Sequence, residues 1–203
     1  MPEYELFKTG FPDYLSMDVA AVCGVLPQET CAYTTHFASD YGERYGEVYL
    51  PHRIYIVQDV SMGAVSALTA TQKQILHCIY SRHYNGFLRQ KHMQLLLEGD
   101  IPEWAFPYIL KVSDEYILQI VELIYDKLVL HDTEQIKSFA RNNLPAFCTS
   151  YSRMVSYWNT YYQTQTPRLS DYAGYKLFWE CFGYTESMEK EAAAQRAVNK
   201  EKK

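Results

Sequence analysis

Residues 114–130 read DEYILQIVELIYDKLVL, and this stretch decides the fold. Its large apolar residues recur three or four positions apart, as they do on one face of a helix. They are Ile117, Ile120, Val121, Ile124 and Leu128. Asp114 belongs to a residue type that favours the helix N-cap, so the helix is predicted to start there. A helix with one apolar face needs neighbouring helices to cover that face.

Turn signals recur at a spacing of 29 residues around this helix, at Asn85-Gly86, Asp114-Glu115 and Asn143-Leu144. Each signal lies between two stretches with helical apolar spacing, so residues 69–163 are predicted to form three successive helical hairpins. A fixed period of this size is typical of stacked repeats. Thr69 and Gln72 have the spacing of a capping box, which predicts the start of the first hairpin.

The first third of the chain differs in kind and is expected to form a small N-terminal α+β cap. Two short helices are predicted there, at Asp18–Val25 and Thr30–Tyr41. Residues 47–57 are dense in β-branched and aromatic side chains, which favour extended chain. Pro51 cannot donate a ladder hydrogen bond, so this segment predicts an edge strand or two short strands. Residues 60–68 are predicted to be a linker.

Beyond the first hairpin, proline and glycine punctuate the helical pattern. Pro107 predicts a kinked or two-part helix after Pro102. A last helix is predicted to open at Ser170-Asp171 and to end at Gly183. The expected domains are residues 1–68 as the α+β cap, 69–185 as the helical repeat domain, and 186–203 as a charged helical or disordered tail.

The composition favours a soluble globular protein. The chain has 203 residues, of which 48% are hydrophobic and 21% charged, and these are ordinary values for such a protein. No run of 18 uncharged apolar residues exists, so no membrane span is expected. The first residues lack the basic and then apolar pattern of a secretory signal, and five cysteines are scattered without paired spacing. We therefore expect a cytoplasmic protein with reduced thiols.

Charge is unevenly distributed along the chain. Residues 1–68 carry three basic against nine acidic side chains, whereas residues 69–185 carry eleven of each. No segment has the basic footprint that binding to a phosphate backbone requires, so nucleic acid is not an expected partner. A basic protein that binds the acidic first third is easier to reconcile with this distribution, although solubility accounts for the same charge.

The stretch Ser81–Arg89, SRHYNGFLR, resembles the turn of a HEAT-type repeat. Repeats of that family place Asp, Asn or Gly in the turn, followed by an apolar residue and an arginine at the start of the second helix. Asp114–Ile117 resembles the same position in the following unit, although Leu118 and Cys148 stand where Arg89 stands in the first. The resemblance covers about residues 69–163. It implies an α-solenoid that recognises proteins on its concave, second-helix face.

Candidate catalytic and metal-binding groups are sparse. The most suggestive set is Cys31, His36 and Asp40, in which His36 and Asp40 would share a helix face and Asp40 would orient the imidazole. Such trios arise by chance, and a buried thiol beside a surface ion pair explains the same residues. His77, Cys78, His83 and His92 match no zinc spacing and are expected to be satisfied core or surface histidines and a core thiol. No metal or cofactor is expected.

Partner-binding residues are expected on the second helices, opposite their buried stripes. Arg153, Tyr157 and Tyr161 are four residues apart and form one row, and Arg89 opens the equivalent helix of the first hairpin. Tyrosine and arginine are enriched among residues that carry binding energy. The alternative is that this row packs against the helix predicted at residues 171–182.

We therefore predict a non-enzymatic scaffold that binds a protein or peptide on the second-helix face of a short, mainly α, HEAT-like solenoid. Two alternatives stay open. One is a small-molecule enzyme with its pocket between the N-terminal subdomain and the helical array, using Cys31 or His36. The other is an inhibitor or structural subunit of a larger assembly, docked through its acidic N-terminal part.

Overall fold

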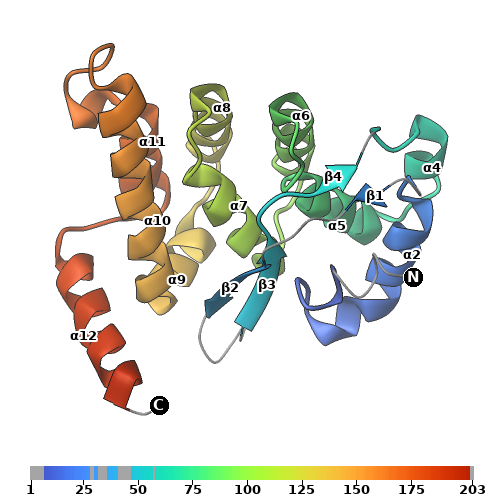
Figure 1. The fold of residues 1–203 in the computed structure, drawn as a ribbon, viewed down its shortest axis with the longest axis horizontal. Helices are drawn as coiled ribbons and strands as arrows, with labels where there is room; N and C mark the ends of the chain where they lie inside the picture. The colour runs from blue at the N-terminus through green and yellow to red at the C-terminus, as the bar shows by residue number, and fades with distance from the viewer. Residues whose placement is uncertain (1–6, 28–29, 32–35, 41–46, 57, 202–203) are drawn as a thin grey trace. The chain divides into compact units, whose positions relative to one another are not determined.

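The chain is mainly helical in its computed structural model, as the sequence predicts (Figure 1). The structure describes the backbone of residues 7–27, 30–31, 36–40, 47–56 and 58–201, and the side chains of residues 7–27, 52–56 and 58–198. The chain divides into two compact units, Met1–Tyr108 and Ile109–Lys203.

Unit 1 is built around a helical hairpin. Its helical segments are η1 (Asp13–Leu15), α2 (Ser16–Val25), α4 (Met62–Ser66), α5 (Ala70–Tyr80), α6 (Gly86–Leu96) and η2 (Glu103–Ala105). The helices α5 and α6 pack against each other, and the Asn85 side chain accepts a hydrogen bond from Phe87 N at 2.9 Å where α6 begins. Thr69 and Gln72 form the predicted capping box at the start of α5. The first predicted hairpin is therefore confirmed.

Four short strands accompany this hairpin. β1 (Thr30–Cys31) pairs with β4 (Tyr55–Ile56), and β2 (His36–Asp40) pairs with β3 (Glu47–Pro51), both antiparallel. The two strands within residues 47–57 are as predicted. The helix predicted at Thr30–Tyr41 is wrong, because its second half forms a ladder with β3 in which His36 lies opposite Pro51.

The N-terminal segment belongs to the same unit as the first hairpin. The Gln72 side chain donates to Asp18 Oδ1 at 2.9 Å, so that α2 is tied to the start of α5. Ile54 N donates to Arg82 O at 2.8 Å, and Tyr84 N donates to Ile54 O at 2.9 Å. These bonds explain why the compact units divide after Tyr108 and not at the predicted residue 68.

The linker predicted at residues 60–68 is wrong, because most of it is the helix α4. Ser61 caps this helix, its hydroxyl accepting from Ala64 N at 3.3 Å. A serine at the N-cap satisfies one of the donors that a helix start leaves free.

Unit 2 has helices joined by turns and no strand among its described residues. Helix α7 (Phe106–Ser113) crosses the boundary between the units and follows η2 as the second part of the predicted two-part helix. Then come α8 (Leu118–Leu128), α9 (Glu134–Asn142), α10 (Leu144–Tyr157), the π-helical turn η3 (Trp158–Tyr162), η4 (Leu169–Asp171), α11 (Ala173–Lys176), the π-helical turn η5 (Leu177–Cys181) and α12 (Ser187–Glu201). Helix α8 packs against α11 and η5, and α10 packs against α11 and α12. Gly183, with φ of 69°, ends the last predicted helix.

Helix α8 buries the apolar stripe that the sequence predicts, with Ile120, Val121, Ile124 and Leu128 in the core. Its start is displaced, because α8 begins at Leu118 and not at Asp114. Asp114 is only 3% exposed and accepts from Lys111 Nζ at 3.3 Å and from Arg153 Nη1 at 3.2 Å. A carboxylate held by two buried or half-buried cations does not serve as a helix cap.

The C-terminal helix α12 is part of unit 2 and not a separate tail. Met188 and Ala192 are buried, and α12 packs against α10. Arg196 Nη2 donates to Pro145 O at 2.7 Å and to Thr149 Oγ1 at 3.0 Å. The boundary predicted at residue 186 therefore does not separate the helix from the rest of the unit, since even a mostly polar helix docks when one face carries a few apolar groups.

Gly174 allows α11 to lie close to α10. A Cβ atom at this position would come within 2.6 Å of Tyr172 Cε1 and 2.8 Å of Met154 Cγ. We expect Gly174→Ala to lower the free energy of unfolding by about 1–3 kcal/mol through overpacking. Urea unfolding followed by circular dichroism measures this.

Gly24→Ala is the matched control. Gly24 lies in α2 with no atom within 4 Å of a Cβ, so the change should stabilise the helix by about 0.5–1 kcal/mol. Equal effects of the two substitutions would contradict the close packing of α11 on α10.

Candidate functional site

Three tyrosines form a partly exposed cluster on unit 2, called here the tyrosine surface: Tyr116, Tyr157 and Tyr161. The ring centroids of Tyr116 lie 6.1 Å from Tyr157 and 6.2 Å from Tyr161, and those of Tyr157 and Tyr161 lie 6.1 Å apart. Tyr116 is 48% exposed and Tyr161 is 55% exposed, whereas Tyr157 is half-buried. The surface therefore combines accessible aromatic area with mutual support between its rings.

A buried ion pair fixes the turn that carries Tyr116. Asp114, two residues earlier, binds Arg153, which lies one helical turn before Tyr157 on α10. Burial raises the pKa of Asp114, while the charges of Lys111 and Arg153 oppose that effect. Arg153 is half-buried, so its guanidinium both neutralises Asp114 and borders the tyrosine surface.

The π-helical turn η3 places Tyr161 and Tyr162. Gln163 N donates to Trp158 O at 2.9 Å, which is the wider π spacing, and such turns often occur at functional sites. The Tyr162 hydroxyl donates to Tyr116 O at 2.5 Å and accepts from Leu118 N at 3.3 Å. Tyr162 therefore binds the backbone on both sides of Ile117, and these bonds fix the position of Tyr116 in the folded chain.

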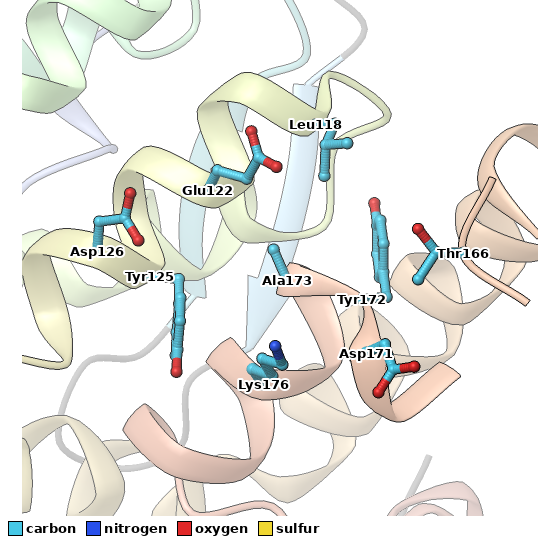
Figure 2. Close-up of a pocket in the computed structure, with 9 residues that line it drawn as sticks. All are labelled: Leu118, Glu122, Tyr125, Asp126, Thr166, Asp171, Tyr172, Ala173 and Lys176. Atoms are coloured by element: carbon cyan, nitrogen blue, oxygen red, sulfur yellow. The ribbon is translucent and has the colours of Figure 1, made fainter. Parts of the chain in front are cut away.

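A polar pocket lies next to the tyrosine surface, between α8 and the segment that leads into α11 (Figure 2). Its volume is about 290 Å³. The residues that line it are Leu118, Glu122, Tyr125, Asp126, Thr166, Asp171, Tyr172, Ala173 and Lys176. Tyr162 stacks on Tyr172 with centroids 5.5 Å apart, so this one ring links the pocket wall to the tyrosine surface.

The pocket wall contains a buried hydroxyl without a partner. Tyr172 is 2% exposed, and its hydroxyl finds no hydrogen-bond partner among the described residues. Burial raises the pKa of Tyr172, and the charges of Tyr162 and Glu122 add to the effect. A buried polar group without a partner lowers the stability of the folded state. A hydrogen bond from a bound group or a water molecule to the Tyr172 hydroxyl would offset this loss.

Unit 1 contains a buried chain of hydrogen bonds between α5 and α6. His77 Nδ1 lies 2.9 Å from His92 Nδ1, and His92 Nε2 lies 3.0 Å from Asp59 Oδ1. Burial alone would raise the pKa of Asp59, but hydrogen bonds from Lys91 and His92 hold it below its usual value. The network therefore assigns one set of tautomers, in which His77 donates to neutral His92 and His92 donates to the carboxylate.

These histidines are satisfied core residues, which is the prediction made for them. Burial lowers the pKa of His77 to about 4, and burial also lowers the pKa of His92. His83 lies 2.8 Å from Ile56 O through Nε2 and accepts from Asn85 N at 2.9 Å. Within the described part of the chain, no three His, Cys, Asp or Glu side chains are placed to hold a metal ion.

The predicted catalytic trio is not on one helix. Cys31 lies in β1, which pairs with β4, whereas His36 and Asp40 lie in β2, which pairs with β3. The shared helix face on which the prediction depended is therefore absent, because residues 36–40 are a strand. The side chains of all three residues lie outside the described residues.

Arg89 does not line an exposed surface. It is 1% exposed, and its Nη1 donates to His83 O at 2.6 Å and to Tyr84 O at 2.9 Å. The guanidinium satisfies two backbone carbonyls of the turn between α5 and α6, which is a structural role. Its expected position on a binding face is therefore wrong, whereas Arg153, Tyr157 and Tyr161 do lie together at the surface.

Sequence reasoning missed Tyr116, Tyr162 and Tyr172. Tyr116 follows the Asp114-Glu115 turn signal, so its place at a hairpin tip could have suggested exposure. Nothing in the sequence indicates that Tyr172 leaves a hydroxyl unpaired. The alternative for the row Arg153, Tyr157 and Tyr161 is packing against residues 171–182. Tyr157 and Tyr161 contact Tyr116, whereas Tyr162, which is not part of that row, stacks on Tyr172.

No family model, curated protein or solved structure matches this chain. None of the helices in the described residues is both long and apolar enough to cross a membrane.

The His77–His92–Asp59 chain makes stability depend on pH. The pKa of His77 is about 4 in the folded state and about 6.5 when unfolded, so the unfolded chain binds more protons between these values. The stability is complete above pH 6.5 and should fall by up to about 3 kcal/mol as the pH drops towards 4. Urea unfolding at pH 7, 5.5 and 4.5 measures this loss.

His77→Gln should reduce that pH dependence, because an amide can donate to His92 without titrating. His131→Gln changes an exposed histidine and serves as the control. Equal pH profiles for the wild type and His77→Gln would show that the histidine pair does not titrate as inferred.

Removing the unpaired hydroxyl should stabilise unit 2. Tyr172→Phe keeps the ring that stacks on Tyr162 and deletes only the buried oxygen. We expect a gain of about 1 kcal/mol in the free energy of unfolding, since the deleted group makes no hydrogen bond. Tyr162→Phe is the matched comparison and should be destabilising, because its hydroxyl makes two hydrogen bonds.

Proposed function

We propose that this chain is a non-enzymatic interaction module whose unit 2 binds a protein or peptide through the tyrosine surface. The observation that carries the proposal is that Tyr116 and Tyr161 are about half exposed while their positions are fixed by neighbouring rings and by Tyr162. Tyrosine supplies a wide contact area with few rotatable bonds, which is why it is frequent among residues that carry binding energy.

Preorganisation favours this surface as a binding site. Binding costs free energy when side chains must be ordered, at about 0.5–1.5 kcal/mol for each mobile side chain. The rings of Tyr116, Tyr157 and Tyr161 already contact one another, so part of this cost has been met in the folded chain.

The finer architecture is also part of the proposal. The capped α5–α6 hairpin and the turn signals spaced by 29 residues support a short HEAT-like α-solenoid, in which a second helix and a turn between helices carry the tyrosine surface. A cytoplasmic location accords with the scattered cysteines, of which Cys23, Cys78, Cys148 and Cys181 are free thiols. In this scheme the chain acts as a scaffold, and the partner is a protein or peptide.

The test is partner capture by the wild type and by a variant that carries both Tyr157→Ala and Tyr161→Ala. A partner retained from the native host by the wild type should be lost or weakened at least about 30-fold, as expected for two central hot-spot residues. Tyr14→Ala removes a still more exposed tyrosine, from unit 1, and should retain the partner.

Circular dichroism and the thermal midpoint establish that the double variant is folded. Tyr161→Ala alone removes the more exposed ring and should give a smaller loss with no change in helicity. Undiminished capture by the folded double variant would remove the tyrosine surface from the proposal.

A further inference from the structure

The pocket of unit 2 points to the chemistry of the group that this surface recognises. It is lined by three carboxylates, from Glu122, Asp126 and Asp171, and by one ammonium, from Lys176. Within the described part of the chain, none of these four charged groups forms an ion pair or a hydrogen bond, so the acids are available to a cation. The surplus of negative charge favours a positively charged guest.

A second, independent feature is the hydroxyl of Tyr172. It is buried in the pocket wall without a partner among the described residues. Figure 2 shows this hydroxyl at the end of the pocket nearest Leu118, towards which the carboxylate of Glu122 also points. The proximity of the two groups also appears in the pKa of Tyr172, which the charge of Glu122 helps to raise.

The Glu122 carboxylate and the Tyr172 hydroxyl are two hydrogen-bond acceptors at one end of the pocket, so they favour a ligand with several donors. A guanidinium has five N–H groups in a planar fork, so it can donate to a carboxylate and to a phenolic oxygen at the same time. An ammonium is a point charge that is more strongly hydrated, and it gains less on entering such a site. Lys176 lies away from the Leu118 end in Figure 2, which leaves that end without a lining cation.

The size and position of the pocket indicate a single side chain of a larger partner. A volume of about 290 Å³ lies at or just below the lower limit for small-molecule sites. Leu118 N and the ring of Tyr172 both contact Tyr162, and Tyr162 lies against Tyr161 of the tyrosine surface. A partner that packs on the tyrosines therefore has the pocket within reach of a neighbouring residue.

Resting on the proposed function, we infer that the pocket between Glu122 and Tyr172 binds an arginine side chain of the partner, through hydrogen bonds from the guanidinium to the Glu122 carboxylate and the Tyr172 hydroxyl. The bound guanidinium would supply the hydrogen bond that the buried hydroxyl of Tyr172 lacks in the folded chain. Such binding also explains why the acids around the pocket are not paired with the cations of their own unit.

The test is a nuclear magnetic resonance titration of the full chain with three blocked amino acids: N-acetyl-arginine amide, N-acetyl-lysine amide and N-acetyl-citrulline amide. The arginine probe should shift the backbone amides of Leu118, Glu122 and Ala173 in a saturable way, with a dissociation constant in the millimolar range expected for one side chain. Citrulline has the same shape without the charge, and it should bind at least about tenfold more weakly, because charge-assisted hydrogen bonds are the stronger ones.

Variants assign the binding to the two acceptors. Glu122→Gln should weaken the arginine probe at least about tenfold, and Tyr172→Phe about threefold, although Tyr172→Phe is expected to be the more stable protein. Glu186→Gln removes an exposed carboxylate elsewhere in unit 2 and should leave binding unchanged. A loss of binding in a protein that has become more stable cannot come from unfolding.

Several outcomes would overturn the inference. They are an absence of saturable shifts, equal binding of citrulline or lysine, and unchanged binding by Glu122→Gln. Free arginine, which carries its own carboxylate, separates a metabolite site from a side-chain site, so tighter binding of free arginine would overturn the assignment to a partner. If the captured partner is lost on changing Tyr157 and Tyr161 but not on changing Glu122, the proposed function stands and only this inference fails.

Discussion

The organisation of unit 2 depends on one buried carboxylate, that of Asp114. A buried charge is tolerated only when it is paired, and removing either partner would leave the other uncompensated. Lys111 from α7 and Arg153 from α10 both bind Asp114, so the turn before α8 is fixed on α10. The same constraint moves the start of α8 to Leu118 and sets Tyr116 against Tyr157, and the tyrosine surface follows from it.

In unit 1 a buried cation, Arg89, fixes the turn between the two helices of the hairpin. Arg89 from α6 donates to the carbonyls of His83 and Tyr84, at the turn between the two helices of the hairpin. In both units an arginine of a later helix binds a turn, but the turn of unit 2 supplies the Asp114 carboxylate, whereas the turn of unit 1 supplies backbone carbonyls. Turns that are buried in this way are rigid, because their backbone groups have partners within the protein.

The polar groups around the pocket of unit 2 do not contribute to stability in the same way. Glu122, Asp126 and Asp171 are exposed and make no ion pair among the described residues, and Tyr172 buries a hydroxyl without a partner there. Features that cost stability in a folded chain are common where a ligand is bound, since sequences selected for stability alone would remove them. At Asp114, by contrast, the buried charge is paired with Lys111 and Arg153. We therefore distinguish the Asp114 network, which stabilises the fold of unit 2, from the pocket, whose polar groups are available for binding.

The sequence by itself determined the local structure of the helices whose signals are short-range. The capping box at Thr69, the cap of α6 at Asn85, the apolar stripe of α8 and the glycine that follows η5 are all set by neighbours within a few residues. The tertiary structure alone decided that residues 36–40 are a strand, that Asp114 binds Lys111 and Arg153 instead of capping a helix, that Arg89 is buried, and that Tyr116 and Tyr172 belong to the site. These depend on partners far apart in the chain, and their free energies come from burial and pairing, which no periodicity in a single segment records.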